Sequence, residues 1–429
     1  MAIDNKDKKV LKSSIEREQN EVACSAECEK IKGSKNLNVP HLRFPEFSGE
    51  WKKCIIQDYG EVITGNTPPT NNAEYYNNGS YLWASPADLG TGKKINDTKT
   101  KLSESGFKKT RIIPKGSILV TCIGSTIGKM GMAVETMSSN QQINSIIVNE
   151  KSNNDFVYYA ISRAFPRYLS EVGVQAVPIL SKSNFEKLPN YTTSIEEQDK
   201  TGYFLNLLDE RIATQNKIIE DLKKLKSAIS KYLFARKDLL ETTICLSNIA
   251  TLKNGYAFQS GKYNALGKWK ILTITNVPGE RYINDEDCNC IINLPNDIQD
   301  HQVLKEGDIL ISLTGNVGRV SLCKNGNYLL NQRVGLLQLA KNVNQEFLYQ
   351  ILSSQRFENS MIACGQGAAQ MNIGKGDVEN YVLPYSSNGN NILFAAKILH
   401  SYDECIINEL RRLTLLTMQK QYLLTQMFI

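Results

Sequence analysis

The chain has 429 residues, of which 41% are hydrophobic and 22% are charged, and its formal net charge at pH 7 is +6. This composition is typical of a folded globular protein, and it excludes a collagen, a wholly disordered chain and a bundle of membrane helices. At about 150 residues per domain, the length predicts roughly three structural units. The mild excess of positive charge permits an anionic partner but does not require one.

The N-terminal segment, residues 1–38, begins MAIDNKDKKVLKSSIEREQ and lacks the apolar core and cleavage site of a secretory signal. We expect this polar extension to be disordered or weakly helical. Ten cysteines in a chain without an export signal indicate free thiols and a cytoplasmic protein. The close cysteine pairs and the three distant histidines lack zinc-ligand spacing, so we predict no metal site.

A long-range repeat organises the rest of the chain. Ile113–Lys129 reads IPKGSILVTCIGSTIGK, and Leu304–Arg319 reads LKEGDILISLTGNVGR, with matching glycines at an offset of 191. The same offset relates Asn140-Gln141-Gln142 to Asn331-Gln332-Arg333. Further on, LSKSNFE corresponds to IGKGDVE at an offset of 193. A period near 190 is far too long for a solenoid, so it predicts two copies of one domain.

Each copy is predicted to mix strands and helices. SILVTCI and DILISLT are short β-branched runs bounded by glycine, which favours buried strands, and SIIVNE and GLLQLA follow them as partner strands. DFVYYAISRAF and EFLYQILSSQRF each predict one short helix.

A long amphipathic helix is predicted after each copy, the first from about Glu196 to Arg236. Its apolar residues match those of the second helix at a single offset of 194, in steps of three, four and seven. This heptad-like spacing favours the two helices packing on each other within one chain over homodimerisation. Three further positions fit the stripe only in part: Asn216 opposite Leu410, Lys226 opposite Lys420, and Gln215 beside the stripe. The matched apolar residues are Leu205, Leu208, Ile212, Ile219, Leu222, Ile229 and Leu233, and then Leu399, Tyr402, Ile406, Leu413, Leu416, Leu423 and Met427.

No catalytic motif emerges from the sequence. The segment Gly124–Lys129 has three residues between its glycines and Met130 after the lysine, whereas a phosphate loop needs four residues and then Ser or Thr. The Pro-Pro sequence at Thr67–Thr70 lacks the amide and the aromatic residue of an amino-methyltransferase tetrapeptide. We therefore predict neither catalytic residues nor a cofactor in this chain.

Positive charge is concentrated in the first copy. Lys93–Lys115 contains eight cations and only two acids, and residues 39–194 carry a net charge of +4, against 0 for residues 247–391. Such a stretch suits contacts with a phosphate backbone, but it is equally compatible with a solvated basic face. The same two alternatives stay open for Lys129 and Arg319, which end the repeated strand-and-turn segments. Trp83 and the tyrosine pairs are expected in the core more often than stacked on bases.

The whole layout over residues 40–429 resembles the specificity subunit of type I restriction–modification enzymes. PHLRFPEFSGEW, from Pro40 to Trp51, resembles the beginning of a recognition domain of that family. The segments Glu210–Phe234 and Leu410–Phe428 resemble its two long helices. The second copy departs from the family pattern because Leu246–Ala250 stands where a second LRFPEF-like segment is expected.

The resemblance implies an α+β fold, with two pseudo-repeated mixed α/β target-recognition domains joined by two long helices that pair as an antiparallel coiled coil. The implied divisions are the extension 1–38, recognition domain 39–194, central helix 195–240, recognition domain 241–392 and C-terminal helix 393–429.

The resemblance also implies a non-catalytic, sequence-specific DNA-binding subunit in defence against foreign DNA. It would bind a bipartite gapped target in double-stranded DNA and recruit two methyltransferase subunits and the restriction subunits. S-adenosylmethionine, ATP and magnesium are expected in those partners, and no membrane is expected. Candidate partner-facing residues are Lys217, Glu220, Lys223 and Arg411.

The predicted DNA-contacting residues carry amide, hydroxyl or cationic groups suited to bases and phosphates. They are Lys93, Lys94, Lys108, Lys109, Arg111, Ser125, Lys129, Gln141, Lys182, Asn316, Arg319, Gln332, Arg333 and Lys375. The alternative function is a non-catalytic coiled-coil scaffold without sequence-specific DNA binding, which the near-neutral second copy favours.

Overall fold

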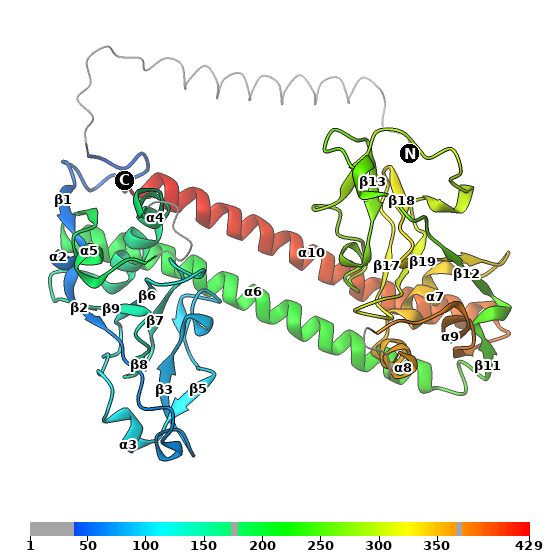
Figure 1. Ribbon diagram of the computed structural model, residues 1–429, viewed down its shortest axis with the longest axis horizontal. Helices are drawn as coiled ribbons and strands as arrows, with labels where there is room; N and C mark the ends of the chain where they lie inside the picture. Colours follow the sequence, from blue (N-terminus) through cyan, green and yellow to red (C-terminus); the bar gives the residue numbers. More distant parts are fainter. Residues whose placement is uncertain (1–37, 173–178, 366–370) are drawn as a thin grey trace, which may run out of the picture. The chain divides into compact units, whose positions relative to one another are not determined.

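Short β-branched runs, buried against helices, organise the chain into two units. The computed structural model describes residues 38–172, 179–365 and 371–429 (Figure 1). Unit 1 combines the chain up to Glu210 with Met418–Ile429, and unit 2 comprises Arg211–Thr417. The predicted N-terminal extension, residues 1–38, lies outside the described residues except for Asn38.

Unit 1 alternates short strands with short helices before its share of the long helices. Its strands are β1 Lys52–Ile55, β2 Gly60–Thr64, β3 Tyr81–Ala84, β4 Lys94–Ile95, β5 Thr100–Leu102, β6 Ile118–Thr121, β7 Met130–Ala133, β8 Ser138–Ser139, β9 Ile143–Val148 and β10 Pro189–Thr192. Its short helices are α2 Ile56–Tyr59, α3 Glu104–Phe107, α4 Asn154–Val172 and α5 Lys182–Glu186, with 3-10 turns η1 Ala73–Tyr75 and η2 Pro86–Asp88.

Unit 2 has the same kinds of element. Its strands are β11 Thr242–Cys245, β12 Ala250–Asn254, β13 Trp269–Leu272, β14 Asn289–Ile291, β15 Val303–Leu304, β16 Ile309–Ser312, β17 Val320–Leu322, β18 Tyr328–Leu330, β19 Val334–Leu339 and β20 Val382–Tyr385. Its short helices are α7 Gln345–Leu352, α8 Gln355–Cys364 and α9 Lys375–Glu379, and its 3-10 turns are η3 Leu246–Asn248, η4 Ser260–Lys262, η5 Ile274–Asn276 and η6 Asp300–Gln302.

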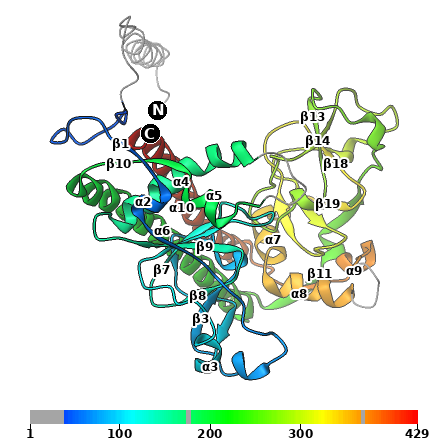
Figure 2. The same cartoon turned by 60° about the vertical axis from the view of Figure 1, so that its left-hand side comes forward.

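The sheet topology repeats from one unit to the other. The order β2-β9-β6-β7 in unit 1 corresponds to β12-β19-β16-β17 in unit 2, β5-β3-β8 corresponds to β14-β13-β18, and the pair β1-β10 corresponds to β11-β20. Parallel pairing of β3 with β8 recurs as parallel pairing of β13 with β18. The duplication predicted from the sequence is therefore a duplication of fold. In both views, α4 and α5 lie at one end of unit 1 and α3 at the other (Figures 1 and 2).

The two long helices are α6, Ile195–Ala235, and α10, Gly389–Met427. All fourteen apolar residues predicted to form the seam are buried or half-buried. In unit 2, Gln215 donates to the backbone oxygen of Glu409 at 3.1 Å, and Lys226 donates to Asp403 at 2.5 Å. Ascending numbers on α6 meet descending numbers on α10, so the helices run antiparallel there, which is compatible with the predicted coiled coil.

The helix ends also complete the core of each unit. Leu205 of α6 and Leu424 and Phe428 near the end of α10 belong to the main apolar cluster of unit 1. In unit 2, Leu233 and Leu399 belong to the main cluster. The strands and short helices of each unit are thus packed directly on both long helices of that unit.

One predicted helix is wrong in detail. EFLYQILSSQRF forms two helices, α7 and α8, because the Ser354 hydroxyl accepts a hydrogen bond from the Phe357 amide and starts a second helix. Its counterpart in unit 1 is the single helix α4, which contains Pro166 and ends at Val172. Among the described residues, no helix has both the length and the apolar character needed to cross a membrane.

The segment with the LRFPEF sequence fastens both long helices in unit 1. Arg43 makes two hydrogen bonds of 2.7 Å to the Glu197 carboxylate on α6, and Trp51 Nε1 donates to the same carboxylate at 3.2 Å. Leu42 donates from its amide to the backbone oxygen of Gln426 on α10 at 2.9 Å. Unit 2 uses a different contact before its first strand, in which Glu241 accepts from the amide and hydroxyl of Ser387.

We expect Arg43→Ala to lower the free energy of unfolding by about 3 kcal/mol, because it leaves the buried Glu197 carboxylate without its cationic partner. Urea denaturation followed by tryptophan fluorescence measures the change. Lys53→Ala, on the exposed face of β1, is the matched control and should have little effect. Equal losses in the two variants would contradict the assignment.

Stability should also depend on the ionisation of Glu197. Burial raises the pKa of this carboxyl, but hydrogen bonds from Arg43, Thr193 and Trp51 outweigh burial and hold the pKa below its ordinary value. The folded state therefore favours the carboxylate. Its contribution is complete above the ordinary pKa, near pH 4.5, and is lost as the pH falls through the lowered folded-state pKa. Denaturation from pH 7 to 3 should give a shallower acid loss for Glu197→Gln than for wild type.

Candidate nucleic-acid interface

Three loops of unit 1 meet at one end of its largest sheet. Thr64, the last residue of β2, pairs with Asn144 of β9, and Thr121, the last residue of β6, pairs with Ile143. Val120 pairs with Met130, the first residue of β7. The chain therefore leaves β2 and β6 and enters β9 and β7 at the same edge. Side chains from segments distant in sequence gather there.

A hydrogen-bond network holds the first two loops together. Thr67 donates to the side-chain oxygen of Gln141 at 2.5 Å, and the Asn66 side chain donates to the backbone oxygen of Lys109 at 2.9 Å. Asn66 also accepts from the Arg111 amide at 2.8 Å. With its oxygen held, the exposed Gln141 presents its amide nitrogen as a donor. Lys109 and Arg111 are brought to the same edge as Gln141.

The loop from β6 to β7 carries Ser125 and Lys129, and both side chains are exposed. They line one shallow concavity together with Ser85, Asn140 and Gln142. Gly128 precedes Lys129 with φ +90°, and a Cβ atom built there would lie 2.8 Å from the ring of Phe165. Glycine is needed at this position both for the left-handed backbone and for the close approach to α4.

A short strand-like contact between residues 122–123 and 179–180 places Lys182 beside the loop from β6 to β7. Ile179 bridges to Ile123, and the amide of Leu180 donates to the backbone oxygen of Cys122 at 2.8 Å. Ser181 then caps α5 by accepting from the Asn184 amide, so Lys182 begins the helix with its side chain exposed. Lys182 pairs with Glu186 at 3.5 Å.

Unit 2 repeats the arrangement with equivalent residues. Asn254 ends β12 opposite Gly335, Ser312 ends β16 opposite Val334, and β17 starts at Val320. Exposed Asn316 takes the place of Ser125, Gln332 that of Gln141, and Lys375 that of Lys182. Arg319 follows Gly318, as Lys129 follows Gly128, and lies 3.5 Å from Glu358 of α8.

The repeated Asn-Gln motif, Asn140-Gln141 and Asn331-Gln332, combines an asparagine that holds the turn with a glutamine that is exposed. The Asn140 side chain accepts from the Gln142 amide at 3.0 Å, and the Asn331 side chain accepts from the Arg333 amide at 3.2 Å. The asparagine therefore shapes the turn, while Gln141 and Gln332 point outward as exposed side chains. Arg333 is also exposed and has no acidic partner among the described residues.

The structure gathers most of the predicted DNA-contacting residues at these two sheet ends. In unit 1 they are Lys109, Arg111, Ser125, Lys129, Gln141 and Lys182, and in unit 2 they are Asn316, Arg319, Gln332, Arg333 and Lys375. Their roles toward DNA stay predictions.

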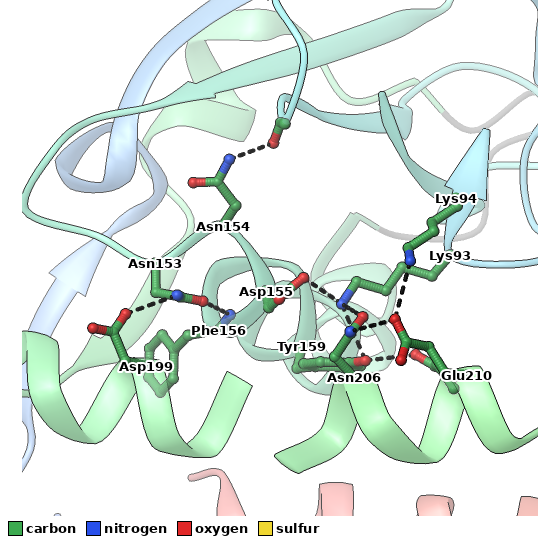
Figure 3. Close-up of polar contacts among 12 residues, drawn as sticks. Lys93, Lys94, Asn153, Asn154, Asp155, Phe156, Tyr159, Asp199, Asn206 and Glu210 are labelled. Atoms are coloured by element: carbon green, nitrogen blue, oxygen red, sulfur yellow. Dashed lines mark hydrogen bonds and ion pairs between the residues drawn. The ribbon is translucent and has the colours of Figure 1, made fainter. Parts of the chain in front are cut away.

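Three predicted residues lie elsewhere, because the basic stretch does not form one face. Lys93 is 7% exposed, and its ammonium group donates to Asp155 at 2.5 Å and to Asn206 at 2.9 Å (Figure 3). Lys94 reaches Glu210 on α6 at 3.2 Å (Figure 3). Lys108 pairs with Glu104 of α3 at 2.6 Å. Lys93 is thus a buried structural cation and not an exposed phosphate contact.

Sequence reasoning missed Asn66 and Thr67, which orient the exposed residues, because single polar residues in a loop give no periodic signal. Trp83, Tyr158 and Tyr159 behave as expected of core residues, whereas Tyr75 and Tyr76 are only half-buried. Trp83 is 9% exposed and donates from its indole nitrogen to the backbone oxygen of Asn66, and Tyr158 and Tyr159 are buried.

The buried thiols of the two units are not activated nucleophiles. Burial raises the pKa of the Cys122 thiol, beneath the loop of unit 1, to about 12. Burial likewise raises the pKa of Cys323 in unit 2 to about 12. Among the described residues, no group of three or more His, Cys, Asp or Glu side chains has a geometry that could hold a metal ion. The exposed groups are amide, hydroxyl and cationic donors.

Two copies of an α+β domain, each packed on a pair of helices and each ending in exposed polar loops, define a duplicated recognition protein. A model of the type I restriction modification DNA specificity domain matches residues 48–224 and again residues 241–417. The chain belongs to this family.

Individual relatives agree with this family. The chain is 26% identical over 349 residues to the type I restriction enzyme MjaVIII specificity subunit of Methanocaldococcus jannaschii, covering 75% of this chain and 78% of that one. It is 32% identical over 151 residues to the HindI specificity subunit of Haemophilus influenzae, covering 34% of this chain and 32% of that relative's length. The type I restriction–modification S subunit from M. genitalium has a similar fold, with TM-score 0.57 and 18% identity over 91% of this chain and 99% of that one.

We expect Gly128→Ala to lower the free energy of unfolding by at least about 2 kcal/mol, because the new methyl group meets Phe165 and the backbone is left-handed. Gly124→Ala is the control, since φ is +96° there but the nearest atom to a built Cβ is 3.7 Å away. It should lose only about 1 kcal/mol, from backbone strain. Thermal and urea unfolding would measure both, and a larger loss in Gly124→Ala would contradict the packing argument.

Proposed function

We propose that the chain is the sequence-specific DNA-recognition subunit of a type I restriction–modification complex, and that each unit reads one half of a bipartite gapped target. The observation that carries this proposal is the recurrence of equivalent polar residues at the same sheet end in both units: exposed Gln141 with exposed Gln332, and exposed Lys129 with half-buried Arg319. Core packing does not require exposed side chains to recur. A shared ligand chemistry explains it.

The exposed groups divide by the part of DNA they suit. Glutamine and arginine side chains can make paired hydrogen bonds to base edges in the major groove, which gives Gln141, Gln332 and Arg333 a role in reading sequence. Lysines and arginines at the rim suit phosphates, which position the protein without reading sequence. Lys109, Arg111, Lys129 and Lys182 would supply these contacts in unit 1, and Arg319 and Lys375 would supply them in unit 2.

The long helices would set the gap between the half-sites and recruit the partners. Large apolar side chains stay exposed on them, and a contiguous apolar patch on a surface is typical of a protein-binding site. In unit 1 these are Tyr203, Leu207, Met418 and Tyr422, and in unit 2 they are Ile218, Leu225, Tyr232 and Leu415. A methyltransferase subunit docked on each unit would cover them, with Lys217, Glu220, Lys223 and Arg411 at the edges.

The chain itself would perform no chemistry. The two methyltransferase subunits would bind S-adenosylmethionine, and the restriction subunits would use ATP and magnesium. Because a methyltransferase must extract its target adenine from the base stack, accurate placement on DNA is what this subunit would contribute. The complex would act on DNA in the cytoplasm, in defence against foreign DNA.

The test is to co-express the chain with the methyltransferase subunit of its own system and to sequence methyladenine positions in the host DNA. A single gapped motif is expected. Gln141→Ala with Ser125→Ala should relax only one half of that motif, and Gln332→Ala with Asn316→Ala only the other. Loss of a paired base contact costs about 1–3 kcal/mol, or roughly 5- to 150-fold in discrimination.

Lys53→Ala, on β1 away from the loops, is the control and should leave both half-sites unchanged. A stable complex that methylates no defined motif and binds DNA without salt dependence would contradict the proposal. That outcome would favour the alternative function, a coiled-coil scaffold without sequence-specific DNA binding.

A further inference from the structure

Each unit contains a partly buried network of charged side chains that its candidate DNA-contacting loops do not use. In unit 1 the network comprises Lys93, Asp155, Tyr159, Asp209 and Lys420, and we name it the first polar junction. Tyr159 donates from its hydroxyl to Asp209 at 2.6 Å, and Lys420 donates to the other oxygen of Asp209 at 2.5 Å. Lys93 donates to Asp155 and lies 4.4 Å from the centre of the Tyr159 ring (Figure 3).

Unit 2 contains the second polar junction, made of Arg281, Glu346, Gln350, Asp403 and Lys226. Lys226 donates to Asp403 at 2.5 Å, and Arg281 and Gln350 donate to its other oxygen at 3.0 and 2.6 Å. Arg281 also holds Glu346 through two hydrogen bonds of 2.8 and 2.7 Å. Each junction thus centres on one aspartate with both oxygens occupied.

The two junctions are equivalent position by position. Lys93 accepts at its backbone oxygen from Met132 of β7, and Arg281 accepts in the same way from Leu322 of β17. Asp155 lies in the first turn of α4, which follows β9, and Glu346 lies in the first turn of α7, which follows the equivalent strand β19. Asp209 on α6 corresponds to Asp403 on α10 at the offset of 194 that relates the two helices.

In each junction, the lysine that pairs with the aspartate comes from the long helix that does not carry the aspartate. Lys420 lies on α10, and Lys226 lies at the equivalent position of α6. These lysines stand within the apolar seam, where a charged residue normally costs stability. Their side chains are only 25% and 18% exposed. Each junction therefore joins three bodies within its unit: the recognition domain, one helix through its aspartate, and the other helix through its lysine.

A heptad seam made only of apolar residues tolerates sliding, because every heptad presents similar side chains. A buried lysine does not tolerate it, because its charge is satisfied only where an aspartate stands opposite. The arginine or lysine of the domain adds a directional contact to the same site. Displacement of any of the three bodies would leave a charge buried and unpaired.

We propose that Lys226 with Asp403, and Lys420 with Asp209, are positioning residues that set the alignment of the helices and the docking angle of each recognition domain, and so restrict the gap length between half-sites that the subunit accepts. This inference rests on the proposed function. It concerns the accuracy of spacing and not the reading of either half-site.

The experiment compares wild type with a full-length double variant that carries both Lys226→Met and Lys420→Met. Methionine keeps the length of the side chain and restores an apolar seam. Each protein is assembled with its methyltransferase, and methylation rates are measured on DNA with the natural gap and with gaps one base pair longer and shorter. Preference for the natural gap should fall at least about fivefold, equivalent to about 1 kcal/mol. The half-site sequences should not change.

Two matched variants accompany it. Lys224→Met with Arg412→Met removes two exposed charges from the same helices and should leave the gap preference unchanged. Lys226→Arg with Lys420→Arg restores the charge and should recover most of the preference. Tyr159→Phe removes the hydrogen bond that the tyrosine hydroxyl donates to Asp209 and the one it accepts from Lys93 at 3.2 Å, and it gives a milder test if the double methionine variant does not fold.

Backbone hydrogen exchange separates failure of this inference from failure of the proposed function. Without DNA, exchange around residues 222–230 and 416–424 should quicken in the double methionine variant and not in the Lys224→Met, Arg412→Met control. If wild type methylates no gapped motif, the proposed function fails and exchange alone decides the alignment role. Unchanged gap preference or unchanged exchange in a folded double methionine variant would overturn the inference.

Discussion

The pairing of one aspartate on a long helix, buried in unit 2 and half-buried in unit 1, is the constraint on which each unit depends. Asp209 and Asp403 lie where a recognition domain meets both helices, and each accepts hydrogen bonds from the domain and from a lysine of the second helix. A buried carboxylate must keep its partners, because an unpaired charge in the protein interior is strongly unfavourable. The sheet ends can carry different side chains in the two units because these junctions, and the apolar clusters around them, hold each domain in place.

The two junctions use different chemistry for the same arrangement. In unit 2, the guanidinium of Arg281 spans Glu346 and Asp403, whereas in unit 1 Lys93 holds Asp155 and the tyrosine hydroxyl supplies the contact to Asp209. Burial lowers the pKa of Lys93, although the Asp155 carboxylate opposes this shift. Arg281 stays charged in any environment and donates to two partners at once. Unit 2 therefore has the more directional attachment of its domain.

Unit 1, whose domain has the less directional attachment, gains further contacts to the helices from a segment that unit 2 lacks. Arg43 and Trp51 converge on Glu197 at the start of α6, and the aromatic ring of Trp51 packs against Phe428, just beyond the end of α10. The separate chain segments of unit 1 are thereby joined at the helix ends. In unit 2, α6 leads directly into the recognition domain through residues 236–241, so no separate fastening segment is required. This connection explains why the LRFPEF sequence occurs once.

The sequence by itself determined the duplication, the strands SILVTCI and DILISLT, the α6 boundaries to within one residue and the apolar seam of the long helices. These features depend on local periodicity and on repetition along the chain, which are visible without a fold. It also paired Gln141 with Gln332 and Lys129 with Arg319 as equivalent candidates, because both pairs stand in segments that recur along the chain.

Only the tertiary structure decided which cations are exposed and what the seam lysines do. Lys93 and Lys109 belong to the same basic stretch, yet the first is buried against α4 and α6 while the second reaches the sheet end. Lys226 and Lys420 appear in the sequence as interruptions of a hydrophobic stripe. Their partners stand 177 and 211 residues away along the chain. Charge complementarity across such separations has no local signature, and so folding alone reveals it.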